Sequence, residues 1–428
     1  MRDGLTIFAD WAAAEGDVTS ARIKIDIAGN NASRAENHWS QSIDDAPILS
    51  AMPLALWLAS FWWRLRWEGK PVVGHCSTSW RMAHEVAAAG YGFLWPRLTF
   101  VSDGEIIRAE CLPTEPRSRE MIRYISNFDI SISAEAFEAG VDNFLSLVLE
   151  RTAGSAPHLR DLWSDVLAER ADPEATNMRR LEAALGFDPE EVPDALMQRL
   201  VHLQKIAGQE AAMEIAALCS GANPSAEIEK VTTFAEDVPG VSAHLVRSLR
   251  FEQPNKTMSA PDRGRTLAHS LRAAAGISQD GPVSDDKLGD LLGLREAQFS
   301  DEANAPRPRH PLAMMVSDES GRDRIIFRGR YSTGKRFEAA RLLCDGLMQK
   351  GESWHPATAS DTARQKMQRA FAAEFLVPIE SLAEYLGRDY SMDAIEGAAD
   401  YFSVSSYTVG SHLANNGLIR RTHPAVPA

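Results

Sequence analysis

The chain has 428 residues, of which 44% are hydrophobic and 24% are charged, and these are ordinary values for folded globular proteins. Such a length predicts roughly two to four domains rather than one. The formal net charge of −14 argues against a chain that wraps nucleic acid with its whole surface, because phosphate binding requires clustered lysine and arginine.

Three features of the sequence bear on location. The four cysteines show no CxxC spacing, which indicates neither a zinc ribbon nor a disulfide framework and favours a reducing compartment. The start, MRDGLTIFADW, lacks the basic and apolar regions of a secretory signal. The most apolar run, 53–63, is shorter than the about 20 residues that cross a bilayer. We therefore expect a cytoplasmic protein without a membrane partner.

Residues 1–153 are predicted to form a mixed α+β domain. Period-two alternation of apolar residues and turn signals such as 102–104 indicate strands, while longer apolar stretches and an N-cap at Ser133 indicate helices. The expected strands are 5–7, 22–27, 46–49, 97–101, 106–110 and 128–132, and the expected helices are 53–67, 80–89 and 134–151.

Residues 154–303 are predicted to be an all-helical middle region, because apolar residues recur there at three-to-four spacing and strand signals are almost missing. The expected helices are 159–170, 176–185, 193–206, 210–219 and 263–275. Two segments, 253–256 and 303–309, have linker composition, the second being rich in proline and arginine.

Residues 304–428 are predicted to form a third domain. It begins with strands at 312–316 and 324–328 and continues with two helices that contain 336–348 and 368–377. A helix at 394–401, a tight turn and a helix at 406–415 follow, which is the spacing of a helix-turn-helix. The fold class that we predict is α+β with several domains.

The motifs of this last domain form an ordered series. Arg336-Phe337 leads into a helix, FAAEFLVP occupies 371–378, and an apolar series runs from Phe402 through Val409 to Ile419. This series resembles the bacterial ImmA/IrrE family of metallopeptidase-like proteins, and the helical segment 276–294 resembles the lead-in of many members. The resemblance covers roughly the last third of the chain. The tryptophan-rich N-terminal region resembles, more loosely, a domain that accompanies some large members.

The resemblance implies a zincin-like domain whose zinc motif, HExxH, falls on 341–345, a segment that we call the slot. The two zinc histidines fall on Arg341 and Asp345, the catalytic glutamate falls on Leu342, and the third, acidic ligand falls on Glu374. A peptidase zinc needs neutral imidazoles and a carboxylate base. Arg341 carries a permanent positive charge and Leu342 cannot accept a proton. We therefore expect no catalytic residue and no metal cofactor, with bound zinc as the alternative.

A cluster of ions is one replacement for the metal. Residues 341 and 345 lie one helical turn apart, so Arg341 can pair with Asp345, and Glu374 of the next helix can supply a second carboxylate. The alternative is that Arg341 points to solvent and forms an ordinary surface pair, since buried ion pairs are costly unless they are well satisfied.

Two surfaces are candidates for binding. The helix 53–67 carries tryptophans on all its faces, and we expect part of it to pack on a neighbouring domain or a partner protein. The partner-binding candidates are Trp57, Trp62, Trp63 and Trp67. The helix-turn-helix offers a polar but weakly basic surface for DNA, and the alternative is that it packs as part of the core. The DNA-binding candidates are Ser406, Tyr407, His412, Arg420 and Arg421.

Two further motifs are incomplete. His84-Glu85 lies on a predicted helix but has Ala88 where a second ligand histidine is needed, so a packed, hydrogen-bonded histidine is the preferred interpretation. The segment 329–335 resembles a phosphate-binding P-loop, but Arg336 replaces the serine or threonine that would hold magnesium.

These observations favour a non-catalytic regulatory or scaffolding protein that acts through protein contacts, and the resemblance connects such a protein with phage, mobile-element or stress control in bacteria. Two alternatives remain: an active zinc metallopeptidase that cleaves a repressor, and a DNA-binding transcriptional regulator. Metal content distinguishes the first two, and a salt-dependent DNA mobility shift identifies the third. The sequence predicts neither the partner nor the oligomeric state.

Overall fold

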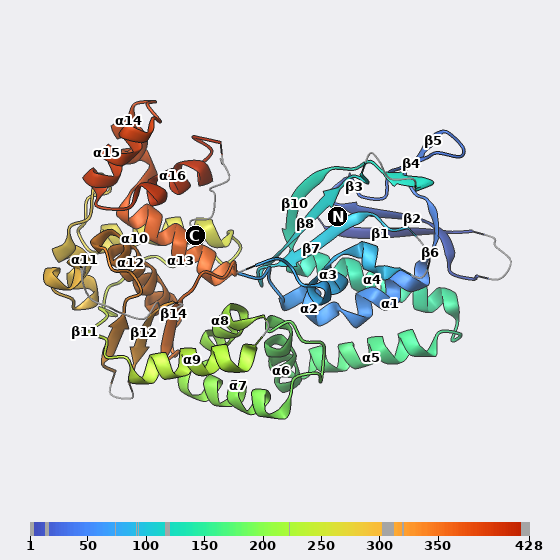
Figure 1. Cartoon of the computed structure of the whole chain (residues 1–428), viewed down its shortest axis with the longest axis horizontal. Coiled ribbons are helices and arrows are strands. Elements are labelled where there is room, and N and C mark those ends of the chain that lie inside the picture. Colours follow the sequence, from blue (N-terminus) through green and yellow to red (C-terminus); the bar gives the residue numbers. More distant parts are fainter. Residues whose placement is uncertain are drawn as a thin grey trace. The chain divides into compact units, whose positions relative to one another are not determined.

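The computed structural model describes residues 4–12, 17–72, 74–90, 92, 94–115, 120–221, 223–301, 312–318 and 321–420. It is a mixed α+β protein (Figure 1). The chain divides into two compact units, the first comprising 1–197 with 219–224 and the second comprising 198–218 with 225–428. The first unit therefore extends beyond the predicted boundary at 153. The predicted linker 303–309 lies outside the described residues.

The first unit contains three antiparallel sheets. In the first, β1 (Leu5–Trp11) pairs with β2 (Ser20–Ile27), which also pairs with β3 (Asn30–Asn31) and β6 (Ile48–Ser50). The second has the order β10 (Phe128–Ser133), β8 (Ile106–Leu112), β7 (Arg97–Ser102). The third joins β5 (Ser42–Asp44), β4 (Ala35–Asn37) and β9 (Ile122–Tyr124). All six predicted strands of this region are present.

Helices cover these sheets. They are α1 (Ala51–Ser60), α2 (Trp62–Trp67), α3 (Thr78–His84), a 3-10 helix Val86–Ala89, α4 (Ala134–Thr152), α5 (Pro157–Ala171) and α6 (Pro173–Ala184). Helix α4 begins after Ser133, whose side chain accepts from the Ala136 N–H as predicted, and it packs on β1, β8 and β10. The predicted helix 53–67 breaks at Phe61, but its hydrogen bonding continues from Trp57 O through Phe61 to Leu65 N.

The second unit is built on one antiparallel sheet. Its order is β11 (Val241–Ala243), β13 (Asp323–Ile326), β12 (Ala313–Ser317), β14 (Trp354–Ala357). Strands β12 and β13 were expected, whereas β11 and β14 were not. Strand β14 contains Pro356, which cannot donate to a ladder and is tolerated because β14 lies at the sheet edge.

Helices make up the rest of this unit, and α14, α15 and α16 lie at the end away from the sheet (Figure 1). They are α8 (Gln209–Cys219), α9 (Pro224–Asp237), α10 (Ala260–Ala274), α11 (Asp285–Leu292), a 3-10 helix Glu296–Phe299, α12 (Ser332–Met348), α13 (Ala363–Leu376), α14 (Ile379–Leu386), α15 (Met392–Phe402) and α16 (Ser406–Asn415). Helix α7 (Asp194–Ala207) crosses the division between the units. Helix α9 was missed in the sequence.

The central contact of the second unit is the crossing of α10 and α13. Gly264 allows it, because a Cβ at this position would lie 2.4 Å from the Met367 carbonyl oxygen and 2.8 Å from the Phe371 nitrogen. Helix α13 also packs on α12, which lies against β12 and β14. The second core therefore fixes the helix that carries the slot against the helix that follows it. Among the described residues, no helix is both long enough and apolar enough to cross a membrane.

Candidate functional site

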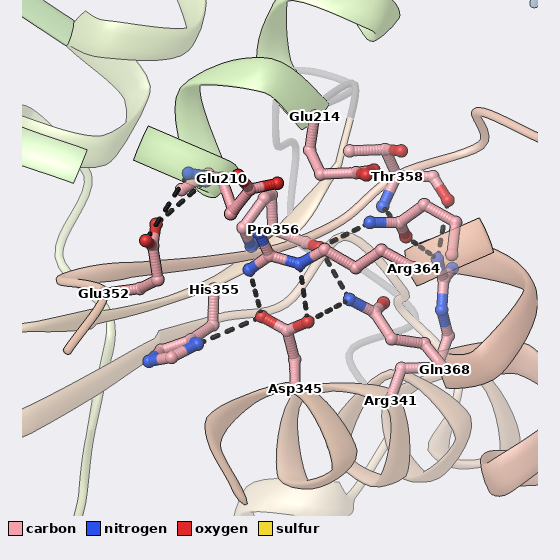
Figure 2. Close-up of polar contacts among 12 residues, drawn as sticks. Glu210, Glu214, Arg341, Asp345, Glu352, His355, Pro356, Thr358, Arg364 and Gln368 are labelled. Atoms are coloured by element: carbon pink, nitrogen blue, oxygen red, sulfur yellow. Dashed lines mark hydrogen bonds and ion pairs between the residues drawn. The ribbon is translucent and has the colours of Figure 1, made fainter. Parts of the chain in front are cut away.

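The slot lies on α12, and its neighbours come from α13 and β14 (Figure 2). Arg341 and Asp345 project from α12 toward Gln368 and Arg364 of α13, and His355 of β14 lies beside Asp345. All of these side chains are buried or nearly so. The slot is therefore an internal polar cluster, and we call it the slot cluster.

Asp345 accepts hydrogen bonds from three side chains. Arg364 binds it in a bidentate manner, with Nε 2.8 Å from Oδ1 and Nη2 2.5 Å from Oδ2. Gln368 Nε2 donates to Oδ1 at 2.7 Å, and His355 Nδ1 donates to Oδ2 at 3.0 Å. Burial alone would raise the pKa of Asp345, but Arg364 and His355 hold it well below its usual range. Both carboxylate oxygens are thus occupied by protein donors.

Arg341 is buried, but no carboxylate of the described residues pairs with it. Its Nη2 donates to the Thr358 carbonyl oxygen at 2.6 Å and to Gln365 Oε1 at 2.5 Å. Burial, together with the nearby Arg369, lowers the pKa of Arg341 to about 9. The guanidinium is still protonated at neutral pH and places a fixed positive charge at the position that the resemblance assigns to the first zinc histidine.

The expected pairing of Arg341 with Asp345 and Glu374 is therefore wrong. Glu374 lies about 9 Å further along α13 than Gln368, because six residues separate them at 1.5 Å each. Its carboxylate faces His412 of α16 and His269 of α10 instead, at 3.3 Å and 3.1 Å from their Nε2 atoms. The residues of α13 that face the slot are Arg364, Gln365 and Gln368.

Glu214 of α8 and Glu352, which precedes β14, add a second layer of carboxylates around the slot cluster (Figure 2). Glu214 is buried and accepts from Thr362 Oγ1 at 2.8 Å. Burial raises the pKa of Glu214, although the nearby Arg364 acts in the opposite direction. Glu352 accepts from the Ala211 N–H at 2.8 Å and so caps the start of α8. These two residues were not identified in the sequence, because nothing in their spacing connects them with 341–345.

The slot does not fit a peptidase zinc. A zinc ion requires free lone pairs of imidazole or carboxylate and an open position for water. The Asp345 oxygens are taken by Arg364, Gln368 and His355, and Arg341 would bring a cation beside the metal. Leu342 is fully buried where the base would be. Within the part of the chain that the structure describes, no group of three histidine, cysteine or acidic residues has metal-binding geometry.

The tryptophan candidates are mostly enclosed by the first unit itself. Trp57, Trp62 and Trp63 are each at most 4% exposed, so these three side chains do not offer the exposed partner-binding surface that we expected. The reason is that α5 and α6 belong to this unit: Trp63 Nε1 donates to Glu169 Oε2 at 2.7 Å. Trp67 is partly buried, with the guanidinium groups of Arg66 and Arg180 at 4.0 Å and 4.2 Å from its ring. The indoles therefore pack against helices that follow residue 153, but these helices belong to the same compact unit.

One of the DNA-binding candidates, His412, is not on the surface. Ser406, Tyr407 and Arg420 are exposed, and Tyr407 retains 68% of its surface. His412 is only 4% exposed and faces Glu374, so it is not available to a groove. Arg421 lies outside the described residues. Helix α16 packs on α13, which agrees with the alternative that the helix-turn-helix is part of the core.

The two incomplete motifs have internal partners. His84 is fully buried, donates from Nδ1 to the Phe100 carbonyl oxygen at 2.8 Å and lies 3.0 Å from Glu68 Oε2. It is a packed, hydrogen-bonded histidine, as expected. In the P-loop-like segment, the Gly329 N–H donates to Glu338 of the same chain at 3.0 Å. A carboxylate therefore occupies the backbone donor that a phosphate would need.

Comparisons with protein-family models, with curated proteins and with solved structures find no match for this chain. The assignment of a function therefore depends on the residues and on the contacts described above.

Proposed function

We propose that the protein is a non-catalytic regulatory or scaffolding protein of the ImmA/IrrE type, in which a slot that resembles a peptidase site serves as a structural lock. The proposal combines the resemblance of the C-terminal motifs with the contacts of the slot cluster. Protein contacts, rather than peptide hydrolysis, would carry its activity in phage, mobile-element or stress control.

The observation that carries this proposal is the bidentate pair of Asp345 and Arg364. A peptidase of this type needs a polarised water and a group that accepts its proton. Here the guanidinium of Arg364 takes the place of the metal ion, and the Asp345 carboxylate that it binds neutralises its charge. Leu342 offers no proton acceptor, so neither half of the hydrolytic chemistry has a residue to perform it.

The slot cluster has a structural role that does not need a metal. Asp345 of α12 receives donors from α13 and from β14 at the same time, and Gln368 also donates to the Pro356 carbonyl oxygen at 3.1 Å. These bonds hold two helices and the sheet edge in one register. A metal ion ligated by facing helices would provide a similar fixed link between elements.

The test is to add zinc to the full chain and measure metal affinity by calorimetry together with hydrolysis of a mixed peptide library. We expect no stoichiometric zinc binding at the slot and no cleavage above the buffer. The matched variants are Asp345→Asn and Asp361→Asn, the second changing an exposed carboxylate that contacts Arg369 at 3.1 Å. Zinc-dependent cleavage that Asp345→Asn abolishes and Asp361→Asn retains would establish the active peptidase instead.

A further inference from the structure

Helices α14 and α15 present an exposed aromatic face. They lie side by side near the end of the chain (Figure 1). Tyr385 of α14 is 47% exposed, and Met392 and Tyr401 of α15 are 66% and 49% exposed. Buried neighbours such as Leu382 and Phe402 hold these helices to the core from the other side. The two tyrosines therefore lie together on an exposed face, whereas Met392, nine residues before Tyr401, projects from the opposite side of α15.

The two tyrosines form an ordered platform rather than two independent side chains. Their rings stack with centroids 4.9 Å apart and an angle of 23° between their planes. The Tyr385 hydroxyl donates to the Gly397 carbonyl oxygen at 3.3 Å. Both rings also pack edge-on against Phe402, so a binding partner would meet rings that are already fixed in place. Fixed aromatic side chains lose little entropy on binding.

The charge around this platform has one sign. Residues 379–402 carry six carboxylates and a single cation, Arg388, which gives this segment a net charge of −5 out of −14 for the whole chain. The six carboxylates are all exposed, and none of them makes an ion pair with any residue that the structure describes; they are Glu380, Glu384, Asp389, Asp393, Glu396 and Asp400.

We propose that this face, which we call the tyrosine face, binds a basic, arginine-bearing helix or segment of a partner protein. Stacked tyrosine rings favour a guanidinium or an alkyl chain over them, and the surrounding carboxylates favour cationic side chains. Phosphates of DNA and anionic lipids are repelled by the same charges. A second copy of this chain that docks through the same face would place −5 against −5.

This inference rests on the proposed function, because it names the chemistry of the protein partner that a non-catalytic regulator would contact. It does not involve the slot cluster. Peptide cleavage in the zinc assay would therefore remove the proposed function without changing the result of a binding assay at the tyrosine face, and the two can fail separately.

The experiment uses the full chain without added metal and two fluorescent helical peptides of equal charge. One carries four arginines and three leucines on one face, and the other carries four arginines and three serines. Fluorescence anisotropy measures their affinities at low and at moderate salt, and a DNA duplex of 20 base pairs is the third probe. We expect the arginine–leucine peptide to bind at least tenfold more tightly than the serine peptide, with weaker binding as salt rises.

Two variants locate the binding. Tyr385→Ala with Tyr401→Ala is expected to weaken the arginine–leucine peptide roughly tenfold. Glu384→Gln with Glu396→Gln and Asp400→Asn changes only exposed carboxylates and is expected to remove most of the salt dependence. The matched controls lie outside the face: Tyr331→Ala removes a tyrosine that is 66% exposed, and Glu236→Gln with Asp237→Asn and Glu252→Gln removes three exposed carboxylates. Neither control should change the affinity.

Three outcomes would overturn the inference. They are equal binding of the two peptides, which indicates only general attraction of charges, equal loss in the control variants, and tighter binding of the DNA duplex than of the arginine–leucine peptide. The carboxylate variant keeps the test valid if the tyrosine variant fails to fold, because its residues are on the surface.

Discussion

Replacing Arg364 should damage the second unit far more than replacing Arg341, although both are buried arginines of the slot cluster. Arg364→Met leaves the Asp345 carboxylate, which is 1% exposed, without its cation. Arg341→Met removes a guanidinium whose acceptors, Thr358 O and Gln365 Oε1, are both uncharged. The two substitutions remove the same atoms and the same charge, so a larger cost at Arg364 reports its pairing with Asp345.

The magnitudes follow from what each change leaves behind. Breaking a buried ion pair by removing one partner costs about 3–5 kcal/mol. Asp345 keeps Gln368 and His355 as donors, which places Arg364→Met near 3 kcal/mol on that scale. Arg341→Met loses two hydrogen bonds, which destabilises the fold, but it also removes a buried charge that has no carboxylate partner among the described residues, which stabilises the fold. We expect it to cost about 1 kcal/mol or less, since replacing buried charges by apolar groups is often neutral.

The assay uses Cys344, which precedes Asp345 on α12 and is a free thiol that is 1% exposed. Its labelling by a thiol reagent requires local or global opening, and the rate therefore reports the free energy of opening at the slot. A loss of 3 kcal/mol corresponds to roughly 150-fold faster labelling, and a loss of 1 kcal/mol to roughly fivefold. Mass spectrometry of the proteolytic peptide that contains Cys344 distinguishes labelling of this thiol from labelling of the other three cysteines.

Equal labelling rates in the two variants would refute this account of the slot, and so would a larger effect of Arg341→Met. In either case the Asp345–Arg364 pair would contribute no more to the fold than an isolated buried arginine. Parent-like rates in Arg364→Met would mean that the pair does not form.

Three more predictions concern other contacts. Burial raises the pKa of Glu214, so the folded state holds this proton more tightly than the unfolded chain does. The free energy of unfolding therefore falls as pH rises from about 4 toward neutral. In thermal melts, Glu214→Gln should match the parent near pH 4 and be more stable than the parent at pH 7. Gly264→Ala should cost about 1–3 kcal/mol in denaturant unfolding, because its Cβ would meet the Met367 carbonyl oxygen at 2.4 Å, whereas the control Gly410→Ala, in α16, adds a Cβ with no atom within 4 Å and should not destabilise. Trp63→Phe should lose about 1 kcal/mol through its bond to Glu169, and a parent-like melt would contradict that contact.

The strand and helix pattern of the first unit was largely predictable, because its alternation is regular. In β2, Ala21, Ile23, Ile25 and Ile27 all point inward, and the period-two rule identifies them directly. The boundary at 153 was less predictable. It rested on a change from strands to helices, but α5 contributes Trp163 and α6 contributes Ala183 to the same core as the sheets. Composition does not show which helices share a core.

In the second unit, the two strands that the sequence missed are short or contain a residue that disfavours a strand. Strand β11 has three residues and pairs with β13, about 80 residues later, so nothing local predicts it. Strand β14 contains Pro356. Its His355 contacts Asp345, so a missed strand also meant a missed partner of the slot.

The slot itself shows where reasoning from spacing ends. One-turn spacing left open whether Arg341 is buried or points to solvent, and in the buried alternative it predicted a pairing of Arg341 with Asp345; the structure buries both residues but does not pair them. Whether two side chains meet depends on what faces them from the next helix. Here α13 presents one guanidinium and two amides, those of Arg364, Gln365 and Gln368. Arg341 and Asp345 each bond to α13 rather than to each other.

A buried charge pair needs a reason beyond stability, because apolar residues of the same volume commonly serve as well. Apolar contacts between α12, α13 and β14 would tolerate small shifts along the helix axes, since their energy changes slowly with position. The Asp345 carboxylate does not tolerate such shifts, because its two oxygens are satisfied only when Arg364, Gln368 and His355 all lie within hydrogen-bond distance. The slot cluster therefore selects one arrangement of the two helices and the sheet edge. Helix α13 in turn supports α16 through Glu374 and His412, so the arrangement fixed at the slot extends to the C-terminal helices that carry the tyrosine face.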